Sequence, residues 1–297
     1  MNSIGYNPDL DQIILSVRGN SELWVIDHQA TTAQAASHTG GRYGKGGDLL
    51  YRWGNPQQYN LGTPASQMLW QQHDTEWISA GLPGAGHILI YNNGIGRNYS
   101  TIDEIVPPVD AAGNYSWTAG TAYGPSTLYW TYKAPIPADF YSAEISGAQR
   151  LPNGNTLICE GVKGNLFEVT SAGEMVWRYL CPVVGTGPLK QGDSIPVDPV
   201  RADQYMNAVF QVHRYPPDYA GLIGRDLMPG GTIELSATSV AADFDGDGDV
   251  DEDDLEIFES CASGPAIPYV TECAAMDLDG DGDADQTDFG LFQRCFS

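Results

Sequence analysis

Two acidic stretches near the C-terminal end have the residue types and the spacing of a cation site. Aspartates recur at alternate positions from Asp243, and they recur again from Asp277, 34 residues later. A hard cation such as Ca²⁺ takes about six to eight oxygen ligands, and alternating carboxylates in one tight loop supply them. A glycine follows the third aspartate of each copy and permits the sharp turn. The spacing therefore predicts two calcium-binding loops.

Alignment with a twelve-residue calcium loop identifies the candidate ligands. The apolar residue at position 8, Val250 or Ala284, is expected to face inward. A solvated acidic tail is the alternative, but two copies in the same phase with glycine at position 6 disfavour it. The predicted ligands are Asp243, Asp245, Asp247, Asp249, Asp254, Asp277, Asp279, Asp281, Asp283 and Asp288.

The surroundings of the loops are more specific than the loops alone. Position 12 is Asp rather than the Glu of an ordinary EF-hand, and a short apolar-patterned helix is predicted after each loop, near 255–258 and 289–292. No entering helix is predicted before the first loop. Together with the tandem copy, these features resemble a dockerin over about the last 55 residues. The resemblance implies two Ca²⁺ ions and a cohesin-like protein partner. Positions 10 and 11 (Glu252-Asp253 and Gln286-Thr287) differ from the Ser-Thr type pair of cellulosomal dockerins.

The net charge of −24 is concentrated in this module. From Asp243 onward the chain has 17 acidic residues and one basic residue, Arg294, which gives −16. Non-specific nucleic-acid binding needs Lys and Arg to displace counterions, so nucleic acid is not an expected partner. No apolar run is long enough to cross a membrane, and no transmembrane segment is expected.

The five cysteines indicate an oxidising compartment. We expect Cys261 to pair with Cys273, which leaves Cys295 unexplained, while Cys159 and Cys181 lie in the larger region. Disulfides imply export to the periplasm or the outside, but Met1 is not followed by a leader peptide. A chain that lacks its natural N-terminus would reconcile the two observations.

The first 236 residues repeat one pattern of strands and turns. Three strand-like runs follow turns, at 12–18, 87–91 and 156–159. Each leads to a run with an aromatic ending, at 49–53, 128–132 and 175–179. A four-stranded unit repeated in this way is typical of a β-propeller blade. We therefore predict a mainly β fold with three blades and a partial fourth, 205–235. Because so few blades cannot close a ring, we expect a partial propeller whose N-terminal blades are missing.

Several motifs resemble the bacterial arylsulfotransferase family over most of 1–236. The more specific elements are Gly44-Lys-Gly-Gly-Asp48 and Gln72-His-Asp74. Ser16-Val-Arg18 and the run from Asn2 to Ile13 also match. The family is a six-bladed propeller that moves a sulfuryl group from a phenolic sulfate donor to a phenol acceptor. The resemblance implies that no nucleotide sulfate donor is used.

By the same resemblance, three residues are candidates for the catalytic site. His73 matches the nucleophile that takes the sulfuryl group covalently, and Arg18 matches the sulfate-binding arginine. Asn2 matches the Asn of a His-x-Asn element whose His would lie before Met1, and a further active-site His also lies upstream. Without the resemblance, a single His beside an acidic residue would more often be structural.

The sequence leaves three functions open. The leading hypothesis is an exported aryl sulfotransferase (1–236) joined by a linker (237–242) to a dockerin-like calcium module (243–297). The alternative is a non-catalytic propeller that binds a glycan or a protein and is delivered by the same module. A carbohydrate-active enzyme ranks last, because no carboxylate pair can be placed across a glycosidic bond.

Overall fold

The chain forms two compact units. The computed structural model describes residues 1–201, 204–228, 230–234, 242–246 and 249–295. One unit comprises Met1–Cys181 with Ile195–Met228, and the other comprises Pro182–Ser194 with Pro229–Ser297. Most of the predicted linker 237–242 lies outside the described residues, so the predicted boundaries remain predictions.

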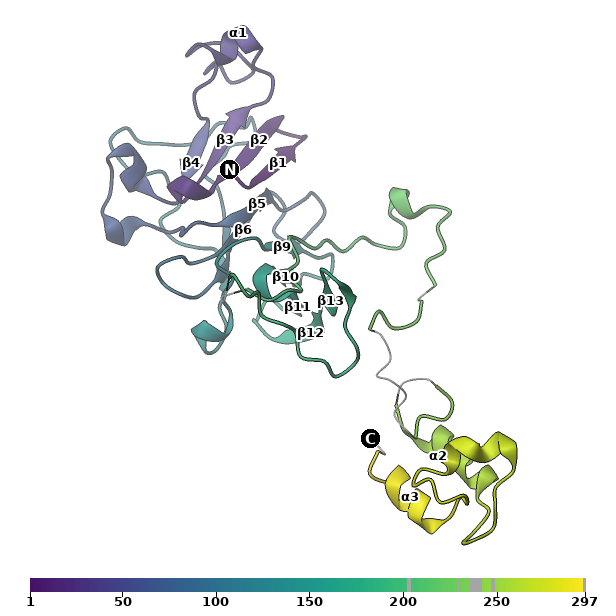
Figure 1. The fold of residues 1–297 in the computed structure, drawn as a ribbon. Coiled ribbons are helices and arrows are strands. Elements are labelled where there is room, and N and C mark those ends of the chain that lie inside the picture. Colours follow the sequence, from purple (N-terminus) through teal and green to yellow (C-terminus); the bar gives the residue numbers. More distant parts are fainter. Residues whose placement is uncertain (202–203, 229, 235–241, 247–248, 296–297) are drawn as a thin grey trace. The chain divides into compact units, whose positions relative to one another are not determined.

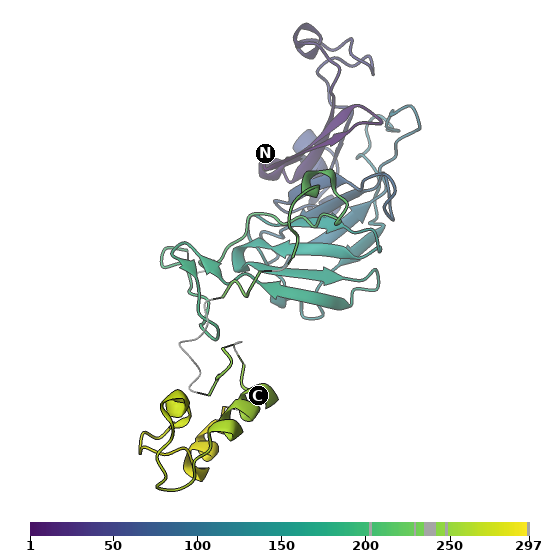
Figure 2. The same cartoon turned by 90° about the vertical axis from the view of Figure 1, so that its right-hand side faces the viewer.

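Three four-stranded antiparallel sheets make up most of the first unit (Figure 1 and Figure 2). Sheet 1 consists of β1 (Ser3–Asn7), β2 (Gln12–Val17), β3 (Glu22–Asp27) and β4 (Tyr51–Trp53). Sheet 2 consists of β5 (His73–Trp77), β6 (Ile88–Asn92), β7 (Thr101–Ile105) and β8 (Trp130–Tyr132). Sheet 3 consists of β9 (Gly147–Arg150), β10 (Thr156–Glu160), β11 (Asn165–Val169) and β12 (Met175–Leu180). In each sheet the strands lie side by side in chain order.

The predicted repetition is confirmed. The three runs expected after turns are the second strands of the three sheets, β2, β6 and β10. The three runs with aromatic endings form their fourth strands, β4, β8 and β12. Each repeat is thus an up-and-down meander of antiparallel strands, with long connections between β3 and β4 (28–50) and between β7 and β8 (106–129).

Consecutive sheets pack face to face through apolar side chains. Sheets 1 and 2 share a core of Ile14, Leu23, Val25, Leu50, Tyr51, Trp53, Leu69, Trp77, Ile88, Ile90 and Ile105. Sheets 2 and 3 share a core of Ile78, Leu89, Tyr91, Ile102, Tyr132, Ala134, Phe140, Ala148, Ile158, Phe167 and Val169. Burying each large apolar side chain contributes about 1.5–3 kcal/mol, so these two cores hold the three sheets together.

The segment predicted as a partial fourth repeat does not form a sheet in its described residues. Among the described residues of 205–234 there is an isolated bridge between Val197 and Tyr205 and one 3-10 turn, and there are no paired strands. The segment instead follows sheet 3, since the Ser146 amide donates to the Phe210 carbonyl (3.0 Å) and the Val209 amide donates to the Gly161 carbonyl (2.9 Å).

Shorter elements connect the strands. The helix α1 spans Thr32–Ala35, and a two-stranded hairpin joins β13 (Val183–Val184) to β14 (Gly187–Pro188). The 3-10 turns are η1 (Arg18–Asn20), η2 (Pro56–Tyr59), η3 (Pro64–Ser66), η4 (Pro137–Asp139), η5 (Gly161–Lys163), η6 (Ala220–Leu222) and η7 (Thr271–Met276). None of the helices within the described ranges is long and apolar enough to cross a membrane.

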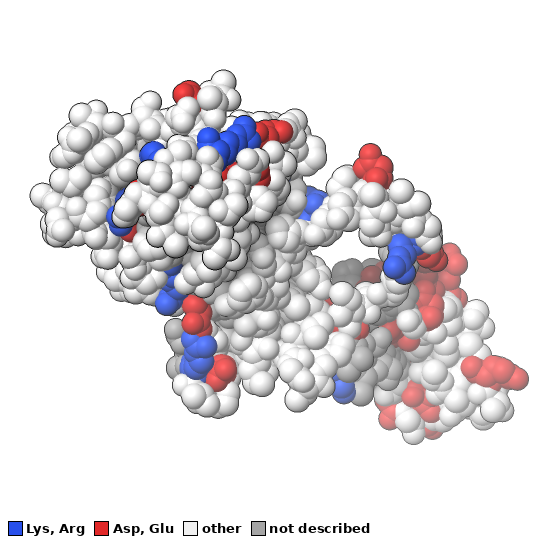
Figure 3. Space-filling model, turned by 90° about the horizontal axis from the view of Figure 1, so that it is seen from above, with Lys and Arg blue, Asp and Glu red and all other residues white. Residues whose placement is uncertain are grey.

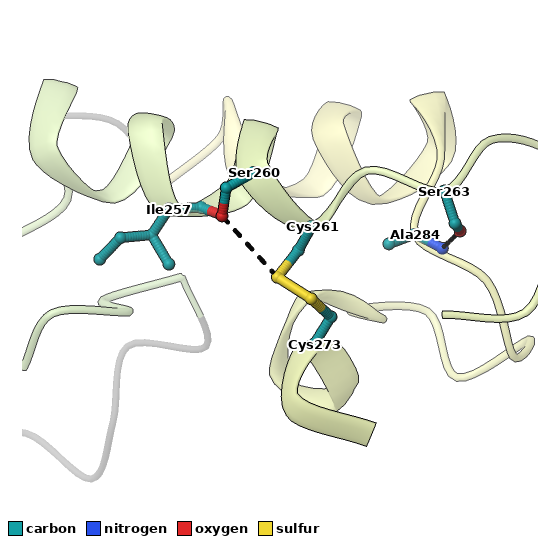
Figure 4. The surroundings of a disulfide bond; sticks show 6 residues. All are labelled: Ile257, Ser260, Cys261, Ser263, Cys273 and Ala284. Atoms are coloured by element: carbon teal, nitrogen blue, oxygen red, sulfur yellow. Dashed lines mark hydrogen bonds between the residues drawn. A yellow bond between two sulfur atoms is a disulfide. The ribbon is translucent and has the colours of Figure 1, made fainter. Parts of the chain in front are cut away.

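The second unit contains the helices α2 (Glu252–Cys261) and α3 (Gln286–Phe292). Its core is largely aromatic, with Phe258 and Phe292 buried and with Phe244 and Phe289 packed against them. The expected bond between Cys261 and Cys273 is present, and it ties the end of α2 to η7 (Figure 4). Acidic side chains gather in one region of the surface seen in Figure 3, with few basic ones among them.

Candidate functional site

His73 lies at the start of β5 with 6% of its surface exposed. Its Nδ1 lies 2.7 Å from the Asn93 Oδ1, and its Nε2 accepts a hydrogen bond from the Ile145 amide at 3.2 Å. The pKa of His73 is lowered to about 4, chiefly by burial and to a lesser extent by the charge of Arg18, while the hydrogen bond with Asn93 opposes the shift. The imidazole is therefore neutral at pH 7, the state in which a ring nitrogen has a free electron pair for nucleophilic attack.

The backbone around His73 is irregular. Gln71 and Asp74 have positive φ angles of 53° and 44°, and the pairing of β5 with β6 slips between His73 and Thr75. At this bulge the Asp74 carboxylate accepts hydrogen bonds from the Ala148 amide (3.0 Å) and from the Gln211 side chain (2.7 Å). Bulges and left-handed non-glycine residues concentrate at functional sites, because they re-aim a side chain at a cost in strain.

Arg18 directly follows β2, and its charge is close enough to affect the pKa of His73. Its Nε is buried and, within the described part of the chain, has no hydrogen-bond partner. A buried guanidinium nitrogen without a partner is costly, so a bound anion would satisfy it.

Asn2 lies beside the residue that precedes His73. Its Nδ2 donates to the Gln72 carbonyl at 2.9 Å, while its Oδ1 is buried without a partner among the described residues. The Gln72 Oε1 is likewise buried without a hydrogen-bond partner among the described residues. The structure thus brings the three predicted residues, Asn2, Arg18 and His73, into one neighbourhood with unsatisfied polar atoms.

Sequence reasoning missed Asn93 and Ile145. Asn93 directly follows β6, just as Arg18 directly follows β2, so the alignment of the repeats places the two residues at equivalent positions. That equivalence is a signal that the sequence contained. No comparable signal exists for Ile145, because it contributes a backbone amide.

In the first predicted calcium loop, carboxylate oxygens of Asp243, Asp245 and Asp254 lie within 4.8 Å of one another. Asp249 and Asp251 form a second such group with Asp254. Asp254 is fully buried, and its Oδ1 accepts the Phe244 amide at 2.6 Å. The predicted ligand Asp247 lies outside the described residues. Asp251, the N-cap of α2, was not predicted as a ligand.

The second loop has the same construction. Asp277, Asp279 and Asp281 form one group of carboxylates within 4.8 Å. Asp288, fully buried like Asp254, forms another with Asp283 and with Asp285, the N-cap of α3. The apolar residue at position 8 faces inward in both loops as predicted, since Val250 is 2% exposed and Ala284 is 0% exposed.

The donor set of these loops fits a hard divalent cation, because every candidate is a carboxylate oxygen. The Asp283 Oδ1 is buried and, within the described residues, has no hydrogen-bond partner. Desolvation, and after it the neighbouring negative charges, raise the pKa of Asp279 and of Asp283. A bound cation would give the buried Asp283 Oδ1 a partner and would neutralise the repulsion between the carboxylates.

Residues 1–180 match the family model described as Arylsulfotransferase (ASST). The chain belongs to the arylsulfotransferase family. The matched residues include all three sheets, together with Asn2, Arg18 and His73. No curated protein matches the chain.

Solved structures show only distant likeness to the arylsulfotransferase chain. A protein of unknown function from Bacteroides caccae is 14% identical (TM-score 0.32), and the match covers 60% of this chain and 45% of that one. Virginiamycin B lyase from Staphylococcus aureus is 9% identical (TM-score 0.30), covering 60% and 40%. A streptogramin B lyase is 14% identical (TM-score 0.28), covering 61% and 55%. The chain therefore spans about half the length of these structures, and we draw no functional argument from them.

Proposed function

We propose that the arylsulfotransferase domain moves a sulfuryl group from a phenolic sulfate to a phenol through a covalent intermediate on His73. The observation that carries the proposal is a buried, neutral His73 whose Nδ1 is held by Asn93, next to an Arg18 with an unsatisfied Nε. Splitting the transfer into two displacements at one nitrogen replaces one difficult step with two easier ones.

Each candidate residue has a role in this chemistry. Charge on a transferring sulfuryl group is spread over its oxygens, and the guanidinium of Arg18 would bind them. The side chain of Asn2, held through its Nδ2 on the Gln72 carbonyl, would orient the donor or the acceptor. The proposal involves no nucleotide sulfate donor.

The test is transfer from a chromogenic aryl sulfate to a phenol, with this chain and with a chain extended upstream to include the predicted further blades. We expect His73→Ala to abolish turnover in whichever chain is active and to abolish a sulfated adduct in intact-mass spectra. Exposed His38 offers a matched substitution, His38→Ala, which should leave both unchanged. Turnover that survives His73→Ala would refute the proposal.

We also propose that the three sheets are blades of the family's six-bladed propeller. Support comes from the face of sheet 1 that points away from sheet 2. It carries Ile4 and Tyr6, 65% and 53% exposed, in cross-strand register with Leu15 and Ile13. The corresponding faces of sheets 2 and 3 are covered by the preceding sheet, so a further blade would cover this one.

For the C-terminal unit we propose a dockerin-like module that binds two Ca²⁺ ions and attaches the exported enzyme to a cohesin-like protein. Asp243, Asp245, Asp249 and Asp254 would hold one ion, with Asp247 and Asp251 as further ligands. Asp277, Asp279, Asp281, Asp283, Asp285 and Asp288 would hold the other. The ions would fold the loops and take no part in sulfuryl transfer.

One observation favours the alternative, a non-catalytic propeller that binds a glycan or a protein. The Ile145 amide donates to the Nε2 of His73, the atom that would attack sulfur. If the extended chain binds aryl sulfates but never forms the sulfated adduct, the binding function replaces the catalytic one.

A further inference from the structure

We propose that Asn93 is a positioning residue that fixes His73 in its Nδ1–H tautomer and so makes Nε2 the sulfuryl-accepting atom. Asn93 is completely buried, and its Oδ1 lies 2.7 Å from the Nδ1 of His73. Its Nδ2 donates to the Ser142 carbonyl at 2.8 Å and to the Ile145 carbonyl at 3.2 Å. The inference rests on the proposed function of His73.

These contacts determine the tautomer by elimination. Both amide hydrogens of Asn93 go to carbonyl oxygens, which can only accept, so its Oδ1 must face the ring. An amide oxygen also only accepts, so the Nδ1 of His73 must carry the proton. A neutral imidazole has a single N–H, which leaves the electron pair on Nε2. The Ile145 amide donates to that electron pair, and this second contact requires the same tautomer.

The tautomer decides which bonds form and break. The Nε2 electron pair forms the N–S bond, the S–O bond to the aryl group breaks, and the phenoxide leaves with its electron pair. The ring keeps its Nδ1 proton and becomes cationic, and the hydrogen bond from Nδ1 to Asn93 is strengthened by that charge. In the second half, the acceptor oxygen attacks sulfur, the electron pair returns to Nε2, and the phenol proton goes to the departed phenoxide.

Asn93 also holds the segment that covers Nε2. Ile145 and Ser146 have φ angles of 48° and 100°, so two non-glycine residues in succession adopt strained conformations. The Asn93 side chain anchors this turn at the carbonyls of Ser142 and Ile145. The Ile145 amide occupies the direction from which sulfur must approach, so the turn has to move before the N–S bond forms. Replacing Asn93 with alanine therefore removes the hydrogen bond to Nδ1 of His73 and also releases the turn that covers Nε2.

The experiment is ¹⁵N NMR of the His73 imidazole in the full chain, with His73→Gln used to assign its signals. We expect the wild type to show a protonated Nδ1 and an unprotonated Nε2, Asn93→Ala to show a mixture of tautomers, and Asn93→Asp to retain the Nδ1–H form. The matched control is Asn92→Ala. Asn92 is equally buried and bonds to Asp103 and Met68, so its loss should leave the tautomer unchanged.

Activity measurements separate this inference from the proposed function. In an active chain, Asn93→Ala should lower kcat at least in proportion to the fraction of imidazole in the Nε2–H tautomer; the loss of about 10⁴-fold that a wholly wrong tautomer causes in a serine-protease triad is its upper bound. Asn93→Asp should restore part of it and move the acid limb of the pH profile upward, because a carboxylate favours the imidazolium. A wild-type Nε2–H tautomer, or an unchanged tautomer in Asn93→Ala, overturns the role of Asn93. The expected tautomers without turnover in either this chain or the chain extended upstream would confirm the positioning and refute the proposed function.

Discussion

The buried imidazole of His73 links the site to the stability of the whole domain. Its ordinary pKa of 6.5 is lowered to about 4 in the folded protein, chiefly by burial. Between these values the unfolded chain binds a proton at His73 that the folded chain does not bind. The contribution of His73 to the free energy of unfolding therefore decreases as the pH falls from 6.5 towards 4, whereas Glu76, whose pKa burial raises to about 8, contributes in the opposite direction.

We predict that His73→Gln weakens this acid dependence. The shift corresponds to up to about 3 kcal/mol of stability, all of it lost below pH 4 and none of it lost above pH 6.5. Urea unfolding of the wild type and of His73→Gln at a series of pH values measures the difference in slope. The exposed His38, changed to Gln, is the control. Parallel pH profiles for wild type and His73→Gln would contradict the prediction.

The same pKa governs catalysis under the proposed function. Because only the neutral imidazole can attack sulfur, we predict that turnover stays constant from neutral pH down to about pH 4 and falls below it. A chromogenic donor whose extinction is calibrated at each pH provides the measurement. An acid limb near the ordinary histidine value of 6.5 would show that His73 is solvated during turnover.

At the scale of elements, a repeated ionic clamp joins neighbouring repeats. In sheet 2, Glu104 pairs across strands with Trp130, and Arg150 from β9 contacts both, with its Nη2 2.5 Å from the Glu104 Oε2 and its guanidinium 5.3 Å from the Trp130 ring. In sheet 3, Glu168 pairs with Trp177 in the same way. Arg214 forms an ion pair with Glu168, and its guanidinium lies 5.1 Å from the Trp177 ring.

Arg214 therefore contacts sheet 3 in the same way as Arg150, which lies in the first strand of sheet 3, contacts sheet 2. The sequence prediction of a fourth unit was wrong about a sheet, yet the chain after sheet 3 still presents the arginine that a first strand presents. Between sheets 1 and 2 the equivalent positions are apolar, since Val25 pairs with Tyr51 and both share a core with Trp77. Equivalent positions at the interfaces between sheets therefore hold either an ion pair or apolar side chains.

We predict that the two clamps differ in strength because they differ in burial. The side chains of Arg150 and Glu104 are 7% and 2% exposed, and Arg150→Met would leave the buried Glu104 carboxylate with only the Nδ1 of His87, 2.6 Å from its Oε1, as a side-chain partner among the described residues. Arg150→Met should therefore lower the free energy of unfolding by up to about 3–5 kcal/mol. Arg214 is 42% exposed, so Arg214→Met should cost about 1 kcal/mol or less. Urea unfolding measures both.

A double variant provides the control for this comparison. Glu104→Gln removes the charge that Arg150→Met leaves unpaired, so the double variant should be more stable than Arg150→Met alone. Equal losses for Arg150→Met and Arg214→Met, or additive losses in the double variant, would show that the ion pairs do not determine the strength of the interface.

At the scale of the whole molecule, the two units depend on different forces. The three sheets are held by large apolar cores, whereas the C-terminal unit has a small aromatic core beside loops of crowded carboxylates. Without a cation these carboxylates repel one another, which opposes the packing of Phe258 and Phe292. The disulfide between Cys261 and Cys273 closes a short loop and restrains the unfolded chain.

We predict that residues 243–297 are largely unfolded in chelator and fold when Ca²⁺ is added, while the sheets are unaffected. Amide NMR spectra across a calcium titration provide the measurement, and calorimetry should count two sites. Asp288→Asn should remove one site and retain the other. Glu252→Gln, on the exposed side of α2, should retain both. Spectra that do not change on adding calcium would refute the prediction.

The features that the sequence by itself determined have local interactions. The two candidate calcium loops could be predicted because their candidate ligands lie within twelve consecutive residues. The three repeats could be recognised because a strand, a turn and the next strand are encoded by neighbouring residues. The cystine between Cys261 and Cys273 spans only 12 residues, and its prediction is confirmed. The family motifs around Arg18 and His73 predicted membership that the family match confirms.

Only the tertiary structure decided how the site is assembled. Asn2 and Arg18 directly flank strands of sheet 1, His73 begins β5 and Asn93 directly follows β6 in sheet 2, and Ile145 lies just before sheet 3. His73 and Ile145 meet although 72 residues separate them. Burial, the pKa of His73 and its tautomer all follow from that packing, because solvent exclusion and hydrogen-bond geometry depend on which distant segments meet. No local pattern in the sequence contains this information.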